Sequence, residues 1–186
     1  YENFSENLKT KVINVPHHLS HIASAYLCSG FNKSLGLTFD GTGDFSCLEL
    51  YDIKDDNFKL EKKISFPHSL GIFYQTVTQY LGFKYYGEEY KVMGLSAYGE
   101  DKYSDYFNDL IGYDEKYCLR QKNIFNYNSI DYKKNKIIKF NKNIFLNKKI
   151  EKFSQESKDI AKSLQVTFEK IVMQIIDRLQ KKVSSN

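Results

Sequence analysis

One segment of the chain, VPHHLSHIASAY at residues 15–26, restricts the fold more than any other. Pro16 suits the first turn of a helix, because the N–H that proline lacks would have no intrahelical partner there. With 3.6 residues per turn, the apolar side chains form one face, and His17 and His21 lie together on the opposite side. The segment therefore predicts a helix over residues 16–29, closed by Gly30 in a left-handed conformation, with two imidazoles on its polar face.

Two imidazoles one turn apart supply half of a metal site, although a histidine pair is also common without a metal. A zinc peptidase of the HExxH type needs a glutamate directly after the first histidine as its general base. His18 occupies that position, which argues against such a peptidase. His18 either supports a metal site from behind or packs in the core.

A short strand separates this helix from DGTGD at residues 40–44. A calcium loop starting at Asp40 would need glycine at its sixth position and glutamate at its twelfth, where the chain has Phe45 and Tyr51. Two glycines instead let backbone N–H groups approach a phosphate, and the alternative is an ordinary Asp-Gly hairpin turn. Asp40, at the end of the strand, is placed to hold a metal or orient a nucleotide, whereas Asp44 is expected to have an ordinary role in the turn.

The remaining patterns predict an α/β chain in which an antiparallel meander is flanked by helices. Ser69 is expected to cap the helix that follows the meander. The predicted elements are strands at 34–40, 45–52 and 58–66, a turn at 41–44, helices at 69–81, 101–111 and 155–182, a glycine-punctuated segment at 82–99, and a hairpin pairing 137–140 with 144–146.

Composition narrows the class of protein. The 186 residues are 41% hydrophobic, enough for a real core, and the net charge of +4 is too small and too evenly spread to indicate nucleic acid binding. Three widely spaced cysteines without a CxxC pair fit a reducing compartment. No apolar run approaches the ~20 residues of a membrane helix, and no leader opens the chain, so we expect a cytoplasmic protein without a membrane partner.

The chain also reads as an incomplete segment of a larger protein, because it starts on Tyr1 and its best motif follows almost at once. Within residues 1–186 we distinguish a motif-bearing part at 12–99, a variable insert at 112–150 and the long helix at 155–183.

Four blocks in this order, VPHHLSHIASAY, LTFDGTGD, SLGIFYQTVTQYLGF and GEEYKVMGLSAYG, resemble the ATP-dependent O-carbamoyltransferases of nodulation-factor and antibiotic biosynthesis. The resemblance implies part of the N-terminal domain of a duplicated actin/hexokinase-like fold, of the ribonuclease H-like type, related to the tRNA threonylcarbamoyl-transfer proteins. It also implies that His17 and His21 bind iron and that Asp40 lies beside the metal and a carbamoyl-adenylate intermediate. From the residue types alone, Fe(II) or another divalent metal such as Mn or Zn would serve.

Further site residues follow from the same blocks. Asp40 and His21 are the candidate catalytic residues, although we favour ligation over base catalysis for His21. The candidate contacts to ATP or carbamoyl-adenylate are Asp40, Gly41, Gly43, Ser69, Gly71 and Lys91. A plain helix cap at Ser69 and Gly71 and a solvated Lys91 are the alternatives.

The resemblance implies transfer of a carbamoyl group from carbamoyl-adenylate to an acceptor hydroxyl on a sugar or other small metabolite. Carbamoyl phosphate and ATP would supply the carbamoyl-adenylate in a C-terminal domain that lies outside this chain, as does a downstream metal-binding aspartate. The alternatives are threonylcarbamoyl transfer for tRNA modification and a catalytically inactive scaffold that binds a metal or nucleotide.

Overall fold

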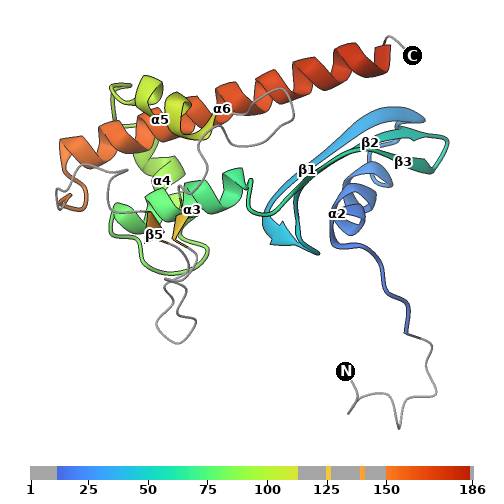
Figure 1. Ribbon diagram of the computed structural model, residues 1–186, viewed down its shortest axis with the longest axis horizontal. Coiled ribbons are helices and arrows are strands. Elements are labelled where there is room, and N and C mark those ends of the chain that lie inside the picture. The colour runs from blue at the N-terminus through green and yellow to red at the C-terminus, as the bar shows by residue number, and fades with distance from the viewer. Residues whose placement is uncertain (1–11, 113–124, 127–138, 141–149, 185–186) are drawn as a thin grey trace, which may run out of the picture.

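The computed structural model describes residues 12–112, 125–126, 139–140 and 150–184. It is an α/β structure in which a three-stranded antiparallel sheet of order β1-β2-β3 is flanked by helices (Figure 1). The elements are α2 (His17–Tyr26), β1 (Lys33–Gly43), β2 (Ser46–Lys54), β3 (Asn57–Ser65), α3 (Leu70–Tyr80), α4 (Glu89–Ser96), α5 (Ser104–Ile111), β4 (Phe125–Asn126), β5 (Lys139–Phe140) and α6 (Gln155–Ser184).

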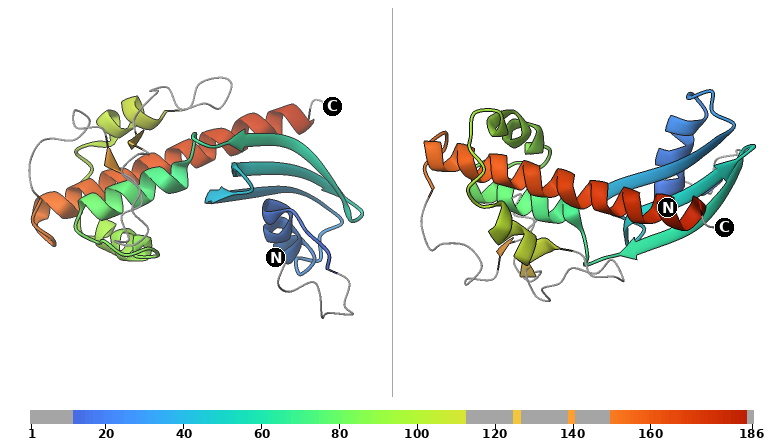
Figure 2. Two further views of the ribbon diagram at one scale, coloured as in Figure 1. Left: turned by 60° about the horizontal axis from the view of Figure 1, so that its bottom comes forward. Right: turned by 90° about the horizontal axis from the view of Figure 1, so that it is seen from above.

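The sheet is covered on both faces. On one face α2 packs through Ile22 and Tyr26 against Tyr51 and Ile53 of β2. The other face joins the larger core shared with α3 and α6, and the views in Figure 2 place α2 and α6 on opposite sides of the sheet. As a consequence, residues 46–51 of β2 are all buried, and this central strand shows no alternation of buried and exposed side chains.

Contacts between aromatic rings join α6 to the strand that carries the candidate site. Phe168 of α6 lies with its ring centroid 6.3 Å from that of Phe39 in β1 and 5.6 Å from that of Tyr74 in α3. These rings fill the space behind β1, on the face away from α2. The long C-terminal helix therefore supports β1 from the core side.

Most predicted elements are confirmed, with shifted ends. The helix expected over 16–29 ends at Tyr26, and Gly30, although its φ is +72°, lies beyond the cap at Leu27 and does not close the helix. Ser69 caps α3 as predicted, since its Oγ accepts the N–H of Ile72 at 3.0 Å. Helix α4 was not predicted, because its glycine and the exposed side chains of Tyr90 and Met93 obscure any helical period.

The predicted hairpin is not observed as stated. Residues Lys139–Phe140 pair with Phe125–Asn126, which the sequence pattern did not indicate as a partner. The expected partner at 144–146 lies outside the described residues, as does most of the variable insert at 112–150.

The turn predicted at 41–44 is wrong in position. β1 continues to Gly43, and the loop consists of Asp44 and Phe45 alone, both with positive φ (50° and 59°). Two-residue loops with positive φ at both positions match the twist of the strands they join. The glycines of DGTGD therefore belong to the strand and not to the turn.

A buried polar stripe on α6 holds the segment between α4 and α5. Asp159 accepts the N–H of Glu100 at 2.9 Å and the ammonium group of Lys102 at 2.6 Å. One turn later, Ser163 Oγ accepts the N–H groups of Lys102 and Tyr103 at 3.0 and 2.9 Å. These side chains supply acceptors for three backbone N–H groups of a loop that belongs to no helix or strand.

The contacts of Asp159 make the stability of the fold depend on pH. Burial acts to raise the pKa of Asp159, but hydrogen bonds from Lys102, the Glu100 N–H and Gln155 outweigh it and hold the pKa below its ordinary value. The ionised carboxylate therefore stabilises the fold above its unfolded-state pKa of about 3.9, and this contribution is lost as the pH falls through the lower folded-state pKa. We expect Asp159→Asn to cost about 1–3 kcal/mol at pH 7. The variant should also flatten the loss of stability that begins near pH ~5 and continues as the pH falls below ~3.9.

Urea unfolding of the wild type and of this variant at several pH values measures both effects. Parallel stability curves for the two proteins would contradict the assignment.

Among the described residues, no helix combines the length and the apolar character required to cross a bilayer.

Candidate metal centre

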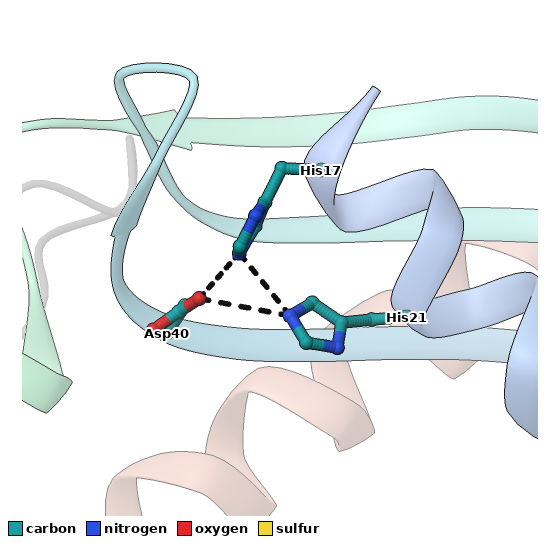
Figure 3. A group of neighbouring side chains, drawn as sticks. All are labelled: His17, His21 and Asp40. Atoms are coloured by element: carbon teal, nitrogen blue, oxygen red, sulfur yellow. Dashed lines mark hydrogen bonds and ion pairs between the residues drawn. The ribbon is translucent and has the colours of Figure 1, made fainter. Parts of the chain in front are cut away.

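Three donor side chains from two elements converge on one point beside the sheet (Figure 3). The Nε2 atom of His17 lies 2.5 Å from Asp40 Oδ2 and 3.1 Å from His21 Nε2. The third edge, from His21 Nε2 to Asp40 Oδ2, measures 3.7 Å. The structure thus brings together the three residues that the sequence predicts as metal ligands.

The buried face of α2 fixes the direction of the two imidazoles. His18 is only 1% exposed, with Nδ1 2.6 Å from Thr38 Oγ1 and Nε2 3.0 Å from the carbonyl oxygen of Ser46. A carbonyl only accepts, so in the neutral ring Nε2 carries the proton and Nδ1 accepts the Thr38 hydroxyl. His18 therefore anchors α2 to β1 and β2, and the outward face of the helix carries His17 and His21.

A bulge in β1 directs Asp40 toward this face. Regular pairing with β2 ends at Phe39 opposite Leu48 and resumes at Gly43 opposite Ser46, so three residues of β1 lie opposite a single residue of β2. A bulge of this kind bends the strand and reorients a side chain. Asp40 is the first residue of the irregular stretch, which corrects its predicted position at the end of a strand.

The start of α3 supports the backbone of Asp40 from behind. Ser69, which is fully buried, donates its hydroxyl proton to the carbonyl of Gly41 at 2.7 Å and lies 3.2 Å from that of Asp40. A Cβ on Gly71 would come within 2.8 Å of the Asp40 carbonyl oxygen, so only glycine allows this approach. Both residues are engaged in structure, and their contact with a nucleotide stays a prediction.

The charge of Asp40 matches its expected role. Burial acts to raise the pKa of its carboxyl group, but the hydrogen bonds from His17 and from the Gly41 N–H, together with the charge of His17 and His21, hold it below its ordinary value. The Gly41 N–H bonds Oδ1 at 2.6 Å, which leaves Oδ2 directed at the histidines. Asp40 is therefore an anion with one oxygen available as a ligand.

The donor set fits a divalent cation. When metal–ligand bonds are about 2.1 Å long, neighbouring ligand atoms are separated by roughly 3.0–3.4 Å. The three distances between the donor atoms of His17, His21 and Asp40 lie on both sides of this range. Two ring nitrogens and a carboxylate oxygen directed at one point cannot all be satisfied by the protons that the rings carry, whereas a cation would bind all three. Two histidines and one carboxylate suit Fe(II), among other metals, and leave further coordination positions open. The side chains remain 31–53% exposed, so an ion can reach them from solvent.

The other predicted site residues lie at different distances from this triad. Gly41 lies within the bulge of β1, and Gly43 is the residue at which pairing resumes. A Cβ on Gly43 would overlap the His17 ring. Lys91 lies on α4, which packs on α6, and its ammonium group pairs with Glu88 Oε1 at 2.5 Å. In Figure 1, α4 lies with the other helices and away from α2, so the structure does not bring Lys91 to the histidines.

Sequence reasoning missed one contact at the site. The carboxylate of Asp44 accepts the backbone N–H of His17 at 2.8 Å and so joins the turn to the first residue of α2. The available signal was the lack of a capping side chain at Pro16, which leaves the first N–H groups of the helix to be satisfied from elsewhere.

Comparison with known proteins places these features in a family. Residues 3–186 match the family model described as carbamoyltransferase N-terminus. The chain is 32% identical over 174 residues to the nodulation protein NolNO of Sinorhizobium fredii, covering 90% of this chain and 23% of that protein. It is 34% identical over 159 residues to the nodulation protein NolO of Bradyrhizobium diazoefficiens, covering 84% and 27%.

A protein of Synechocystis is 43% identical over 93 residues, which are 50% of this chain and 15% of that protein. The chain thus spans between about a seventh and about a quarter of the length of these three relatives. The match over nearly its whole length shows that the chain belongs to the carbamoyltransferase family, in the part described as its N-terminus.

Proposed function

We propose that this chain is the metal-binding part of an enzyme that transfers a carbamoyl group from carbamoyl-adenylate to the hydroxyl group of a sugar or other small metabolite. The convergence of His17, His21 and Asp40 on one point carries the proposal, because these donors come from two elements and face one another. Membership of the carbamoyltransferase family supports the proposal that the transferred group is a carbamoyl group. The same family context makes a duplicated actin-like fold our proposal for the complete protein.

The chemistry of the site agrees with such a transfer. A bound divalent ion would polarise the carbamoyl carbonyl or lower the pKa of an acceptor hydroxyl, which is a poor nucleophile at neutral pH. His17, His21 and Asp40 would hold the ion, and Gly41 would keep Asp40 Oδ1 occupied so that Oδ2 stays directed at it. ATP and carbamoyl phosphate are the proposed sources of the carbamoyl-adenylate, formed outside this chain.

Metal binding is the direct test. We expect the purified chain to bind one Co(II), used as a spectroscopic substitute for Fe(II), and His21→Ala to weaken binding by at least ~10-fold. His68→Ala is the matched control, because it removes a histidine outside the triad. Titration followed by visible absorption measures the affinity, with a thermal melt for each variant. Equal affinities for the wild type and His21→Ala would contradict the proposed ligand set.

The reaction itself requires the longer protein. The chain could bind Co(II) at the triad while the full-length protein, given ATP and carbamoyl phosphate, transfers no carbamoyl group to any hydroxyl. That pair of results would indicate the inactive scaffold instead. We expect the 186-residue chain alone to give only background in a phosphate or pyrophosphate release assay with these two compounds.

A further inference from the structure

The tip of the β1–β2 hairpin touches the helix that carries both histidines. The N–H of His17, the first residue of α2, donates to Asp44 Oδ2 at 2.8 Å. The first N–H groups of a helix have no partner within it, and Pro16 at the cap supplies no side-chain acceptor. Asp44 therefore caps α2 from another element, with a negative charge at the end of the helix where a carboxylate is favoured.

The same tip also contacts the ring of His17. Gly43 lies so close to the imidazole that a Cβ at this position would overlap its Cγ and Cδ2 atoms. The backbone of His17 is thus held by Asp44 while its ring rests against Gly43. Two consecutive residues of the hairpin therefore fix both the backbone position of His17 and the direction of its ring.

The turn holds Asp44 in an uncommon conformation. Its φ is +50° and that of Phe45 is +59°, whereas non-glycine residues rarely adopt positive φ. Aspartate tolerates this region better than most residues. Phe45, which is 83% exposed, adds little packing, so the hydrogen bond to α2 is the contact that distinguishes this turn.

From these contacts we propose that Asp44 is a positioning residue of the metal centre, which fixes His17 at the distance and orientation needed to share an ion with Asp40. The inference rests on the proposed metal function but names a residue outside the ligand set. Since His18 and Ile22 keep α2 on the sheet independently, loss of the Asp44 carboxylate should loosen His17 without undocking the helix.

The chain contains a matched control for this residue. The β2–β3 loop consists of Asp55 and Asp56, with φ of +48° and +61°, between Lys54 and its pairing partner Asn57. Asp55 is the structural counterpart of Asp44: an exposed aspartate at the first position of a two-residue loop. It lies at the opposite end of β2, roughly 30 Å from Asp44 at the ordinary rise of a strand, so it cannot reach His17 at the start of α2.

Two measurements on the chain test the proposal. In the first, without metal, amide hydrogen exchange of His17 should become at least ~5-fold faster in Asp44→Ala, because its N–H loses its acceptor. In the second, Co(II) affinity should fall ~10-fold in Asp44→Ala, as for loss of an outer contact that orients a ligand. Asp44→Asn, which keeps an acceptor oxygen, should restore most of both properties.

Asp55→Ala should change neither property, although it places alanine at the same φ. If Asp44→Ala and Asp55→Ala behave alike in both measurements, the positioning role is overturned. If the wild-type chain itself binds no Co(II), the proposed metal function is overturned, and the exchange measurement still decides whether Asp44 holds His17.

Discussion

Replacing Asp40 by asparagine in the protein that contains this chain is expected to lower carbamoyl transfer at least ~100-fold while the fold is retained. Asparagine keeps the size of the side chain but removes the negative charge directed at His17 and His21. Its single oxygen cannot both accept the Gly41 N–H and face the histidines. A neutral amide oxygen holds a divalent cation far less well than a carboxylate. Carbamoylation of the acceptor measures the loss, and a thermal melt verifies folding.

Asp44→Asn is the comparison variant, because it changes the same residue type four positions away and keeps an acceptor for the His17 N–H. Its cost should be far smaller than that of Asp40→Asn. Small and equal losses from both variants would mean that DGTGD is only a hairpin and that the triad has no role in the transfer.

Gly43→Ala is expected to weaken Co(II) binding toward ~100-fold, the largest effect we expect from any residue that supplies no ligand. Gly43 does not have a positive φ, so its backbone accepts alanine without strain. The added methyl group, however, would occupy the space of the His17 ring, and the ring must turn away from Asp40 to make room.

Gly94→Ala serves as the control for this substitution, since a Cβ on Gly94 in α4 would meet nothing within 4 Å. It should leave Co(II) binding unchanged and slightly stabilise the chain, because alanine is a better helix former than glycine. Retained affinity in Gly43→Ala would show that the His17 ring does not need its present orientation to bind a metal.

The parts of the site that the sequence predicts are those set by local spacing. His17 and His21 are one helical turn apart, so their shared face follows from the helix alone. The Ser69 cap is equally local, since its acceptor and its donor are three residues apart. Asp40 was placed beside the histidines by resemblance, and the structure brings it within hydrogen-bond distance of His17.

The parts that the sequence did not predict depend on pairing between distant residues. The bulge after Phe39 is defined only by its register against β2, and this register moved the turn from the glycines to Asp44 and Phe45. The burial of His18 depends on its bonds to Thr38 and Ser46, 20 and 28 residues away. Periodicity describes one element at a time and carries no information on such partners.

The contacts also differ in the entropy that is lost when they form, because their partners are separated by different lengths of chain. His17 and Asp44 are 27 residues apart, whereas the Asp159 contact that docks α6 spans 59 residues back to Glu100. Loop-closure entropy grows with the logarithm of loop length, so for flexible connections the shorter contact costs about 0.7 kcal/mol less to close. The contact that joins the histidine helix to the hairpin is therefore the less costly of the two to close, and neither of its partners lies in the C-terminal helix.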